Sequence, residues 1–461
     1  MPRFSPAQLA AWTAGHWTEE PSRALLGFGI DTRRLKSGDV FVALKTAERD
    51  GHDFLAAAAA AGASAALVEQ VQVGVALPQL VVDRTLAAFQ KIAREHRRNF
   101  AGKVTGISGS AGKTSTKDLL ARLLGPQTLA TEGNLNNHLG VPLTLTRLDS
   151  ECHEFAVVEA GISAPGEMAV LADMIEPDVG VITLVDHAHT KELGGLAGVA
   201  REKSVLPAQV RENGVAVFPL GVAKMDPFRA LAGRRLVVQR ADVVLPESTD
   251  RDTIYFTVTH RGANTAIVVA QGDSPVEHYT FRRVSDGMTQ NAVLAISVAR
   301  WLGVEPTDIR TRLEGWGPAP LRGEVRQERG RLVYVDCYNA NPASMIDALG
   351  IFDELSQEVS NRLFIVGGME ELGEECELKH RELGQRLRLR ASDQLLLIGT
   401  GAESVRFGAL DRGARDAQIE VLGSLQGVDQ RVAAWPGPVF IKGSRRYHLE
   451  SVLAGETGGA H

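Results

Sequence analysis

A glycine-rich loop followed by lysine and threonine carries the clearest chemistry in this 461-residue chain. The loop comes directly after the strand-like stretch Val104–Ile107 and before the helix-like run Lys113–Leu124. Glycines let backbone N–H groups approach phosphate oxygens, a lysine reaches the β and γ phosphates, and a threonine hydroxyl ligates Mg²⁺. The spacing is the compact Gly-x-x-Gly-Lys-Thr form, and an ordinary strand-to-helix turn is the alternative. We therefore predict a nucleotide-binding loop made by Gly109, Ser110, Ala111, Gly112, Lys113, Thr114 and Ser115.

Two further side chains that could ligate a metal ion follow predicted strands. Glu159 ends the apolar run Phe155–Val158, and His189 comes just after the run Gly180–Val185, with Lys203 about one helix length later. A carboxylate and an imidazole at adjacent strand ends could hold a second divalent ion beside the γ-phosphate. For each residue alone, a solvated loop position would be the simpler interpretation, but their shared location favours a metal site.

A loop rich in carboxamides lies between these features. It runs Thr131-Glu132-Gly133-Asn134-Leu135-Asn136-Asn137-His138-Leu139-Gly140-Val141-Pro142. Carboxamides donate and accept hydrogen bonds without charge, which suits a peptide or sugar carbonyl held near the phosphates. We therefore take Asn134, Asn136 and Asn137 as candidate substrate-binding residues. The alternative is that the loop is only an elaborate turn.

The elements that position these residues form three predicted blocks. Residues 1–102 read as a small α/β unit closed by a helix over Thr85–Asn99. Residues 103–318 alternate near-continuous apolar strands with helices, which indicates a mostly parallel sheet covered on both faces, with a hairpin insertion within Leu236–Ala270. Residues 319–461 follow a Gly/Pro-rich linker and read as a smaller doubly wound unit. Ligands of such sheets bind beyond the carboxyl ends of the strands, where Thr114, Glu159 and His189 are expected to meet.

Composition narrows the function classes. Hydrophobic and charged residues make up 44% and 23% of the chain, which are ordinary values for a globular protein. The net charge of −6 gives no overall positive charge to attract nucleic acid, so we expect no nucleic-acid partner. The three cysteines lack metal-binding spacing and fit a reduced, cytoplasmic compartment. No apolar run is long enough to span a bilayer, and nothing demands a partner chain, so we expect a cytoplasmic monomer without an integral membrane segment.

Nearly end to end, the chain resembles the Mur ligase family. The resemblance rests on Asp31-Thr32-Arg33, Asp50 to Phe54, the Gly109–Thr114 loop, Gly133-Asn134 to Pro142, Glu159, His189, Lys203, Asp336 to Pro342 and Lys442 to Arg445. Asn-Ala-Asn-Pro at 339–342 and the Asn136-Asn137 pair are similar to the member that adds D-alanyl-D-alanine. The resemblance implies an α/β protein of three domains: a UDP-sugar domain, a central P-loop ATPase domain and a C-terminal Rossmann-like domain that closes over the site.

The same resemblance implies residue roles. Lys113 would bind phosphate, Thr114 the first Mg²⁺ ion, and Glu159 with His189 the second, while the lysine matching Lys203 is typically carbamylated in this family and then serves as an anionic metal ligand. Arg322 would reach the γ-phosphate from the C-terminal domain. Asn291, Asp336 and Tyr338 would contact the nucleotide. The candidates for the UDP-sugar side are Asp31, Thr32 and Arg33, and those for the incoming dipeptide are Asn339, Asn341 and Arg445.

The implied reaction uses ATP to phosphorylate the terminal carboxylate of a UDP-MurNAc-tripeptide, after which the amine of D-alanyl-D-alanine attacks the acyl phosphate. Mg²⁺, Lys113 and Arg322 would offset the charge that builds up between anions. Three stretches depart from the family pattern. Gly368 replaces a usual aspartate, residues 287–291 lack the usual His-Asn, and Lys45–Glu48 differ from a glycine-containing stretch.

Three alternatives stay open at this stage. The first is another amino-acid-adding ligase of the superfamily, including the folylpolyglutamate type. The second is a P-loop NTPase switch or motor, in which hydrolysis drives binding rather than bond formation. The third is a degenerate ligase kept as a binding partner.

Overall fold

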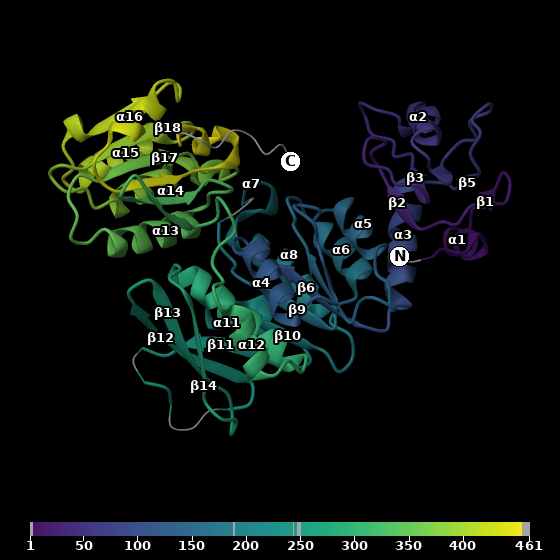
Figure 1. Cartoon of the computed structure of the whole chain (residues 1–461), viewed down its shortest axis with the longest axis horizontal. Helices are drawn as coiled ribbons and strands as arrows, with labels where there is room; N and C mark the ends of the chain where they lie inside the picture. Colours follow the sequence, from purple (N-terminus) through teal and green to yellow (C-terminus); the bar gives the residue numbers. More distant parts are fainter. Residues whose placement is uncertain (1–2, 188–189, 243, 247–249, 454–461) are drawn as a thin grey trace.

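Three β-sheets organise the chain. The structure, a computed structural model, describes residues 3–187, 190–242, 244–246 and 250–453. Within these residues the sheets have five, nine and six strands. Figure 1 shows them as three lobes, with the nine-stranded sheet in the lower lobe between the other two. The expected α/β class is confirmed.

The first sheet has the strand order β1-β5-β4-β3-β2, in which only β1 is antiparallel to its neighbour. Its strands are β1 (His16–Trp17), β2 (Gly27–Gly29), β3 (Asp39–Val42), β4 (Ala65–Val68) and β5 (Gln79–Val81). The accompanying helices are α1 (Pro6–Thr13), η1 (Gly51–Phe54), α2 (Leu55–Ala60) and α3 (Thr85–Arg98). As the periodicity predicts, α3 buries Phe89, Ile92 and Ala93. This helix joins the first lobe to the central one.

The central sheet has the order β14-β13-β12-β11-β10-β9-β6-β8-β7. Its strands are β6 (Lys103–Ser108), β7 (Thr128–Ala130), β8 (Phe155–Glu159), β9 (Val179–Ile182), β10 (Val215–Pro219), β11 (Arg235–Arg240), β12 (Thr253–Arg261), β13 (Asn264–Ala270) and β14 (Glu277–Arg282). Strand β6 pairs in parallel with β8 on one side and β9 on the other. The chain therefore reverses its direction of winding beside β6, which is where a doubly wound sheet opens a crevice for ligand.

Helices cover both faces of the central sheet. One apolar cluster joins α4 and α11 to the sheet, and a second joins α5, α6 and α8 to the other face. The helices of this lobe are α4 (Lys113–Leu124), α5 (Gly140–Leu145), α6 (Glu167–Ile175), α7 (Thr190–Leu193), α8 (Gly195–Ala208), α9 (Leu220–Ala223), α10 (Asp226–Arg229), α11 (Asp286–Trp301) and α12 (Pro306–Leu313). Two covered faces explain why the central strands are apolar almost without interruption.

The hairpin predicted within residues 236–270 exists, and it extends the central sheet. Strands β12 and β13 pair antiparallel from Tyr255↔Ala270 to Arg261↔Asn264. Strand β12 also pairs in parallel with β11. The alternating pattern therefore marks the edge of the main sheet, where one face is less deeply covered, and not a separate insertion.

The third sheet has the order β15-β16-β20-β17-β18-β19, parallel except for β15. Its strands are β15 (Glu324–Glu328), β16 (Arg331–Asp336), β17 (Leu363–Gly367), β18 (Gln394–Ile398), β19 (Ile419–Leu422) and β20 (Val439–Lys442). The helices are α13 (Pro342–Leu355), η2 (Gly373–Glu375), α14 (Cys376–Arg386), α15 (Ala402–Asp411), η3 (Asp416–Gln418), α16 (Val428–Ala434), η4 (Arg445–Tyr447) and η5 (Leu449–Val452). Two apolar clusters, one on each side of the sheet, match a doubly wound unit.

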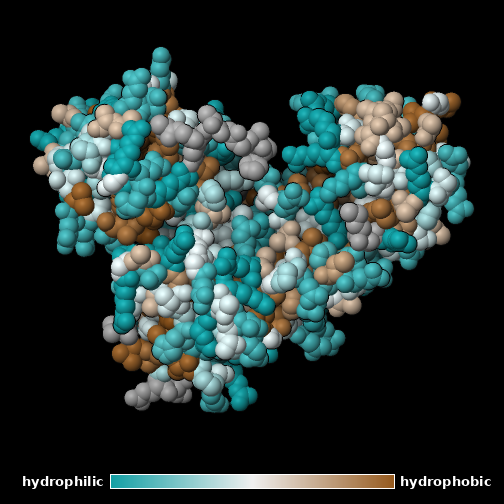
Figure 2. All heavy atoms as spheres, in the orientation of Figure 1, coloured by the Kyte–Doolittle hydropathy of each residue, from teal (hydrophilic) through white to brown (hydrophobic). Residues whose placement is uncertain are grey.

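The outer surface is mixed in character. Figure 2 shows hydrophilic and hydrophobic residues interspersed over the visible face, and a hollow between the lobe of the third sheet and the lobe of the first. Among the described residues, no helix combines the length and the apolar character that crossing a membrane would require.

A buried arginine fixes the first lobe to the central one. Arg97 on α3 is fully buried and donates to the Ile175 carbonyl at 2.9 Å and to Asp178 Oδ2 at 2.8 Å. Asp178 Oδ2 also accepts the backbone N–H of Val104 at 2.9 Å, at the start of β6. Burial lowers the pKa of Arg97 to about 10, yet the guanidinium stays charged at neutral pH.

Asp178→Ala is therefore expected to destabilise the protein strongly, because it leaves a buried guanidinium without its counter-ion and Val104 N without its acceptor. Breaking a buried pair on one side costs about 3–5 kcal/mol, which thermal unfolding will show as a lowered midpoint. The matched control is Asp411→Ala, which removes a solvent-exposed pair with Arg381 that is worth at most about 1 kcal/mol. Equal midpoints for the two variants would contradict the assignment.

Candidate active site

The predicted phosphate loop lies between the carboxyl end of β6 and the amino end of α4, as the sequence indicated. Gly109 and Gly112 have φ values of +153° and +80°, a backbone region that favours glycine. A Cβ on Gly109 would lie 1.9 Å from Thr183 Oγ1, and one on Gly112 would lie 2.3 Å from Asn291 Nδ2. Both glycines are therefore required by conformation and by space.

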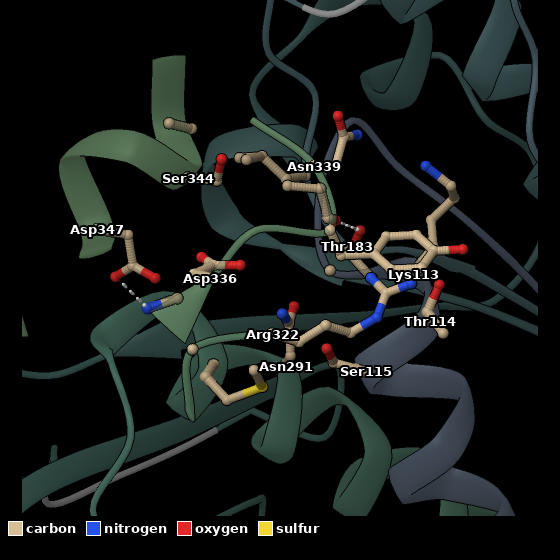
Figure 3. A pocket seen from close by; sticks show the side chains of 18 of the residues that line it. Lys113, Thr114, Ser115, Thr183, Asn291, Arg322, Asp336, Asn339, Ser344 and Asp347 are labelled. Carbon is tan, nitrogen blue, oxygen red and sulfur yellow. Dashed lines mark hydrogen bonds between the residues drawn. The ribbon is translucent and has the colours of Figure 1, made fainter. Parts of the chain in front are cut away.

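Lys113 and Thr114 begin α4 and face the cavity beside the loop (Figure 3). The Lys113 ammonium donates to the Gly109 carbonyl at 2.8 Å. Burial lowers the pKa of Lys113, nearby Glu159 raises it, and Arg322 lowers it further. The positive charge thus sits at the helix end that already attracts anions.

Glu159 ends β8, directly across from Ile107 of β6, and is 1% exposed. Its Oε1 accepts a hydrogen bond from Asn136 Nδ2 at 2.8 Å. Its Oε2 is buried without a hydrogen-bond partner in the described part of the chain. A buried carboxylate oxygen without a partner is unfavourable unless something binds it, so Glu159 fits a cation at this position.

Lys203 on α8 is 2% exposed. Burial lowers its pKa well below the ordinary value, and the charge of Lys113 lowers it further, against an opposing effect of Glu202. Within the described ranges, its ammonium makes no hydrogen bond or ion pair. His189, the remaining expected metal ligand, lies outside the described residues, and those described contain no cluster of three His, Cys, Asp or Glu side chains that could hold a metal ion.

The third lobe completes the site from the opposite side. The Arg322 guanidinium lies over the Tyr338 ring, 3.7 Å from its centroid, and points toward Lys113 and Thr114 (Figure 3). Asp336, at the end of β16, accepts a hydrogen bond from the buried Lys442 ammonium at 2.5 Å. Asn341 donates its side-chain amide to the Ser110 carbonyl at 3.0 Å, so the two lobes meet at the phosphate loop.

The cavity between the two lobes has a volume of about 320 Å³. It gathers predicted nucleotide, metal and substrate residues from both lobes: Ser110, Ala111, Gly112, Lys113, Thr114, Ser115, Asn134, Asn136, Glu159, Asn291, Arg322, Asp336, Tyr338, Asn339 and Asn341. Figure 3 shows Lys113, Thr114 and Ser115 at the start of α4 on one side of the cavity, and Ser344 and Asp347 of α13 on the other. A polar cavity at a helix amino end, with Lys113 and Arg322 in its wall, suits a polyphosphate ligand.

Three family models match the chain. They are the Mur ligase family, catalytic domain, over residues 26–104; the Mur ligase middle domain, over 107–244; and the Mur ligase, glutamate ligase domain, over 321–435. The UDP-N-acetylmuramoyl-tripeptide–D-alanyl-D-alanine ligase of Escherichia coli (strain K12) is 31% identical over 92% of both chains. The chain belongs to the Mur ligase family. The enzyme of the same name from Bacillus subtilis (strain 168) is 29% identical over 93% of this chain and 92% of its own.

Solved Mur ligases have the same three-lobed architecture. A MurF from Acinetobacter baumannii aligns over 98% of both chains with a TM-score of 0.84 and 27% identity. A MurF ligase from Thermotoga maritima in complex with ADP covers 93% of this chain and 96% of its own, with a TM-score of 0.77 and 26% identity. A folylpolyglutamate synthase from Mycobacterium tuberculosis shares the fold only, at 17% identity and a TM-score of 0.58. The expected ATP-dependent ligase is confirmed, and neither the folylpolyglutamate type nor a P-loop switch is favoured.

Some predicted residues of this Mur ligase lie away from the cavity. Asp31 and Arg33 pair with each other in the first lobe, and Arg33 lowers the pKa of Asp31 to about 2; Thr32 stands between them. Asn137 accepts the backbone N–H groups of Leu139 and Gly140 and so shapes the start of α5. Arg445 pairs with Glu450 in the third lobe.

Sequence reasoning also missed residues that line the cavity. Thr183 follows β9, and the amino end of α11 contributes Ser285, Gly287, Met288 and Gln290. Others come from the third lobe: Tyr334, Ala343, Ser344, Asp347 and Lys442. Lys442 belongs to the Lys442 to Arg445 stretch on which the family resemblance rests, and this was the one sequence signal for these residues.

Gly109→Ala is expected to weaken ADP binding about tenfold or more, because the new methyl group would displace Thr183 and the backbone would be strained. Calorimetric titration with ADP measures the loss. The control is Gly221→Ala on α9, where no atom lies within 4 Å of an added Cβ and φ is not positive. ADP affinity in Gly109→Ala equal to that of the control would show that the loop tolerates a side chain and is not shaped as described.

Proposed function

We propose that this Mur ligase joins D-alanyl-D-alanine to UDP-MurNAc-tripeptide at the expense of ATP. Curated relatives that bear this activity in their names match the chain over nearly its whole length. The observation that carries the proposal is the cavity itself: phosphate-loop residues and Glu159 on one wall face Arg322 and the Asn339–Asn341 segment on the other. An acid activated by ATP on one wall would lie next to an amine held by the other.

The proposed division of labour follows the three sheets. Residues 1–102 would hold the UDP-sugar, with Asp31, Thr32 and Arg33 as candidate contacts. Residues 103–318 would bind ATP, and residues 319–461 would bind the dipeptide through Asn339, Asn341 and Arg445. Asn134, Asn136 and Asn137 would face the peptide end of the UDP-sugar substrate. We also propose that the enzyme acts as a cytoplasmic monomer.

The residues around the phosphate loop would act mainly by charge. Backbone N–H groups of residues 109–115 would hold the phosphates, with Lys113 on the transferred group. Arg322 would approach the same group from the third lobe, where Asp336, Tyr338 and Asn291 would position the nucleoside. These groups offset the negative charge that develops when a carboxylate attacks a phosphate. The two closed walls would limit the access of water to the acyl phosphate.

Two magnesium ions would fit the donors that the chain offers. Thr114 supplies a hydroxyl for one, and Glu159 supplies a buried carboxylate oxygen without a partner for the other, together with His189. When bound, the ions would shield the carboxylate and the γ-phosphate from each other. The protein's own task is to fix the Thr114 hydroxyl, which follows β6, and the Glu159 carboxylate, which ends the neighbouring strand β8.

Lys203 is proposed to carry a carbamate. Its lowered pKa favours the neutral amine, which is the form that adds CO₂. Lys113 and Arg322 would place two cations near one carboxylate, an arrangement that repels Mg²⁺. Carbamylation would give the uncharged Lys203 amine a negative charge and so balance the charge of the metal site.

Mass spectrometry of the product tests the proposed function. With ATP, Mg²⁺, UDP-MurNAc-tripeptide and D-alanyl-D-alanine, the product is expected to gain one dipeptide less one water. D-Alanine alone is the matched control and should give no product. Addition of a single amino acid, or phosphate release without any amide, would refute the assignment.

Lys203→Ala is expected to lose most ligase activity, about a hundredfold or more, since a metal ligand is removed. Lys203→Arg is the matched control for charge: arginine keeps a cation at this position but does not form the carbamate, so it should be equally inactive, and high bicarbonate should restore neither variant. Carbon-13 NMR of wild-type protein in labelled bicarbonate should show a carbamate signal that both variants lack. Full turnover in Lys203→Arg would remove the carbamate from the mechanism.

A further inference from the structure

Helix α13 is one part of the third lobe that docks on the central lobe. A second part lies at η2, where Glu375 Oε2 is 2.6 Å from His187 Nδ1 and the Leu372 carbonyl accepts a hydrogen bond from Thr190. Helix α13 lies on the side of its lobe that faces α11 (Figure 1). Three of its positions meet the central lobe: Ala343, Asp347 and Glu354. Because they are spaced four and seven residues apart, they form one stripe along the helix. On α13, the docking surface is thus a single helix face made of polar contacts.

The two contacts farther along the stripe reach α11 and the segment before it. Asp347 Oδ1 accepts the backbone N–H of Gly287 at 2.8 Å, drawn as a dashed line in Figure 3. Glu354 Oε2 pairs with the Arg283 guanidinium at 2.7 Å and is half exposed. These two contacts hold the helix to the central lobe without touching the phosphate loop.

The amino end of α13 is held by the phosphate loop itself. Asp186 Oδ2 accepts the backbone N–H of Ala343 at 3.1 Å. The Asp186 backbone is in turn bonded to Ser110, whose Oγ donates to the Asp186 carbonyl at 2.8 Å and accepts the Asp186 N–H at 2.9 Å. The Ser110 carbonyl accepts the Asn341 amide at 3.0 Å. Ser110, Asp186, Ala343 and Asn341 therefore close a ring of hydrogen bonds across the two lobes.

The sequence of the helix start explains why an outside acceptor is needed. Asn341 caps α13 by accepting the N–H of Ser344, and Pro342 has no N–H to satisfy. The backbone N–H of Ala343 is the donor of the first turn that remains without a partner inside the helix, and Asp186 accepts its hydrogen bond. A carboxylate is also the favoured partner for the positive end of a helix.

We infer that Asp186 is a positioning residue that keeps the third lobe in register with the phosphate loop while the amine attacks. The inference rests on the proposed function. Asp186 does not line the cavity, so its effect would reach the chemistry only through α13 and the Asn339–Asn341 segment that precedes it. Without this contact the acid would still be phosphorylated, but the amine would be poorly placed, and water would take a larger share of the acyl phosphate.

The ratio of phosphate released to amide formed measures this role directly. Attack by the amine and attack by water both release one phosphate, but only the first leaves an amide. Wild-type protein is expected to give a ratio near one, and Asp186→Ala a ratio raised about tenfold, the usual effect of losing a hydrogen bond to a charged group. ADP affinity should change by less than about twofold, since the binding residues are intact.

Three further variants make the test specific. Asp186→Asn keeps an acceptor oxygen and should bring the ratio back toward one. Asp186→Ser is too short to reach Ala343 and should behave like the alanine variant, which it replaces if that protein cannot be purified. Glu354→Gln removes the charge from the far contact of the same helix and should leave the ratio unchanged.

An unchanged ratio in Asp186→Ala or Asp186→Ser would overturn the inference, whatever happens to the overall rate. A ratio that rises as much in Glu354→Gln would overturn it too, because any loosening of the helix would then suffice. Wild-type protein that releases phosphate but makes no amide would overturn the proposed function, and the inference with it.

Discussion

The hydrogen bond from the Asn341 amide to the Ser110 carbonyl makes one site out of two sheets. One wall is the phosphate loop, in which Gly109 and Gly112 have positive φ angles and Gly109 also lies close to Thr183. The other is the amino end of α13, with Arg322 and Asp336 beside it. Neither wall alone encloses a polyphosphate. The site therefore exists only when the lobes are in register, and the contacts that set this register matter as much as those that would touch ligand.

The phosphate loop and the strand ends could be predicted from the sequence because their signals are local. A strand, a glycine-rich turn and a helix are contiguous in the chain, and parallel strands necessarily bring their carboxyl ends to one edge. Glu159 therefore reached the cavity as expected. The helix α4 begins and ends at the predicted residues, since the same lysine that faces the phosphates opens its first turn.

Other parts of the site could not be predicted because their signals are not local. Asp186 lies 157 residues before Ala343, and Gly287 lies 60 residues before Asp347. In the sequence alone, Asp186 and His187 look like ordinary loop residues. Only the folded chain shows that Asp186 contacts α13. The place of the predicted hairpin in the sheet could not be predicted for a similar reason, since the pairing of β12 with β11 is decided by sheet assembly and not by the hairpin's own pattern.

Charge balance connects the buried groups of the central lobe. The charge of Arg322 lowers the pKa of Lys113, and the charge of Lys113 in turn lowers the pKa of Lys203. Glu159 is the carboxylate among them that keeps an oxygen free of hydrogen bonds. Such a site favours a polyanion strongly and a metal ion only with added negative charge. ATP and a carbamate would each supply some of that charge.

Gly368, which stands where the family pattern has aspartate, has a steric explanation. A Cβ at this position would lie 2.4 Å from the Thr400 carbonyl oxygen and 3.0 Å from Tyr447 Oη. Tyr447 is held there by hydrogen bonds from the Thr400 N–H, at 2.9 Å, and to a carboxylate oxygen of Glu370. An aspartate at 368 would have to displace this tyrosine. In this chain the Tyr447 phenol thus occupies the space beside Gly368. The nearby carboxylate is that of Glu370, two residues later in the sequence.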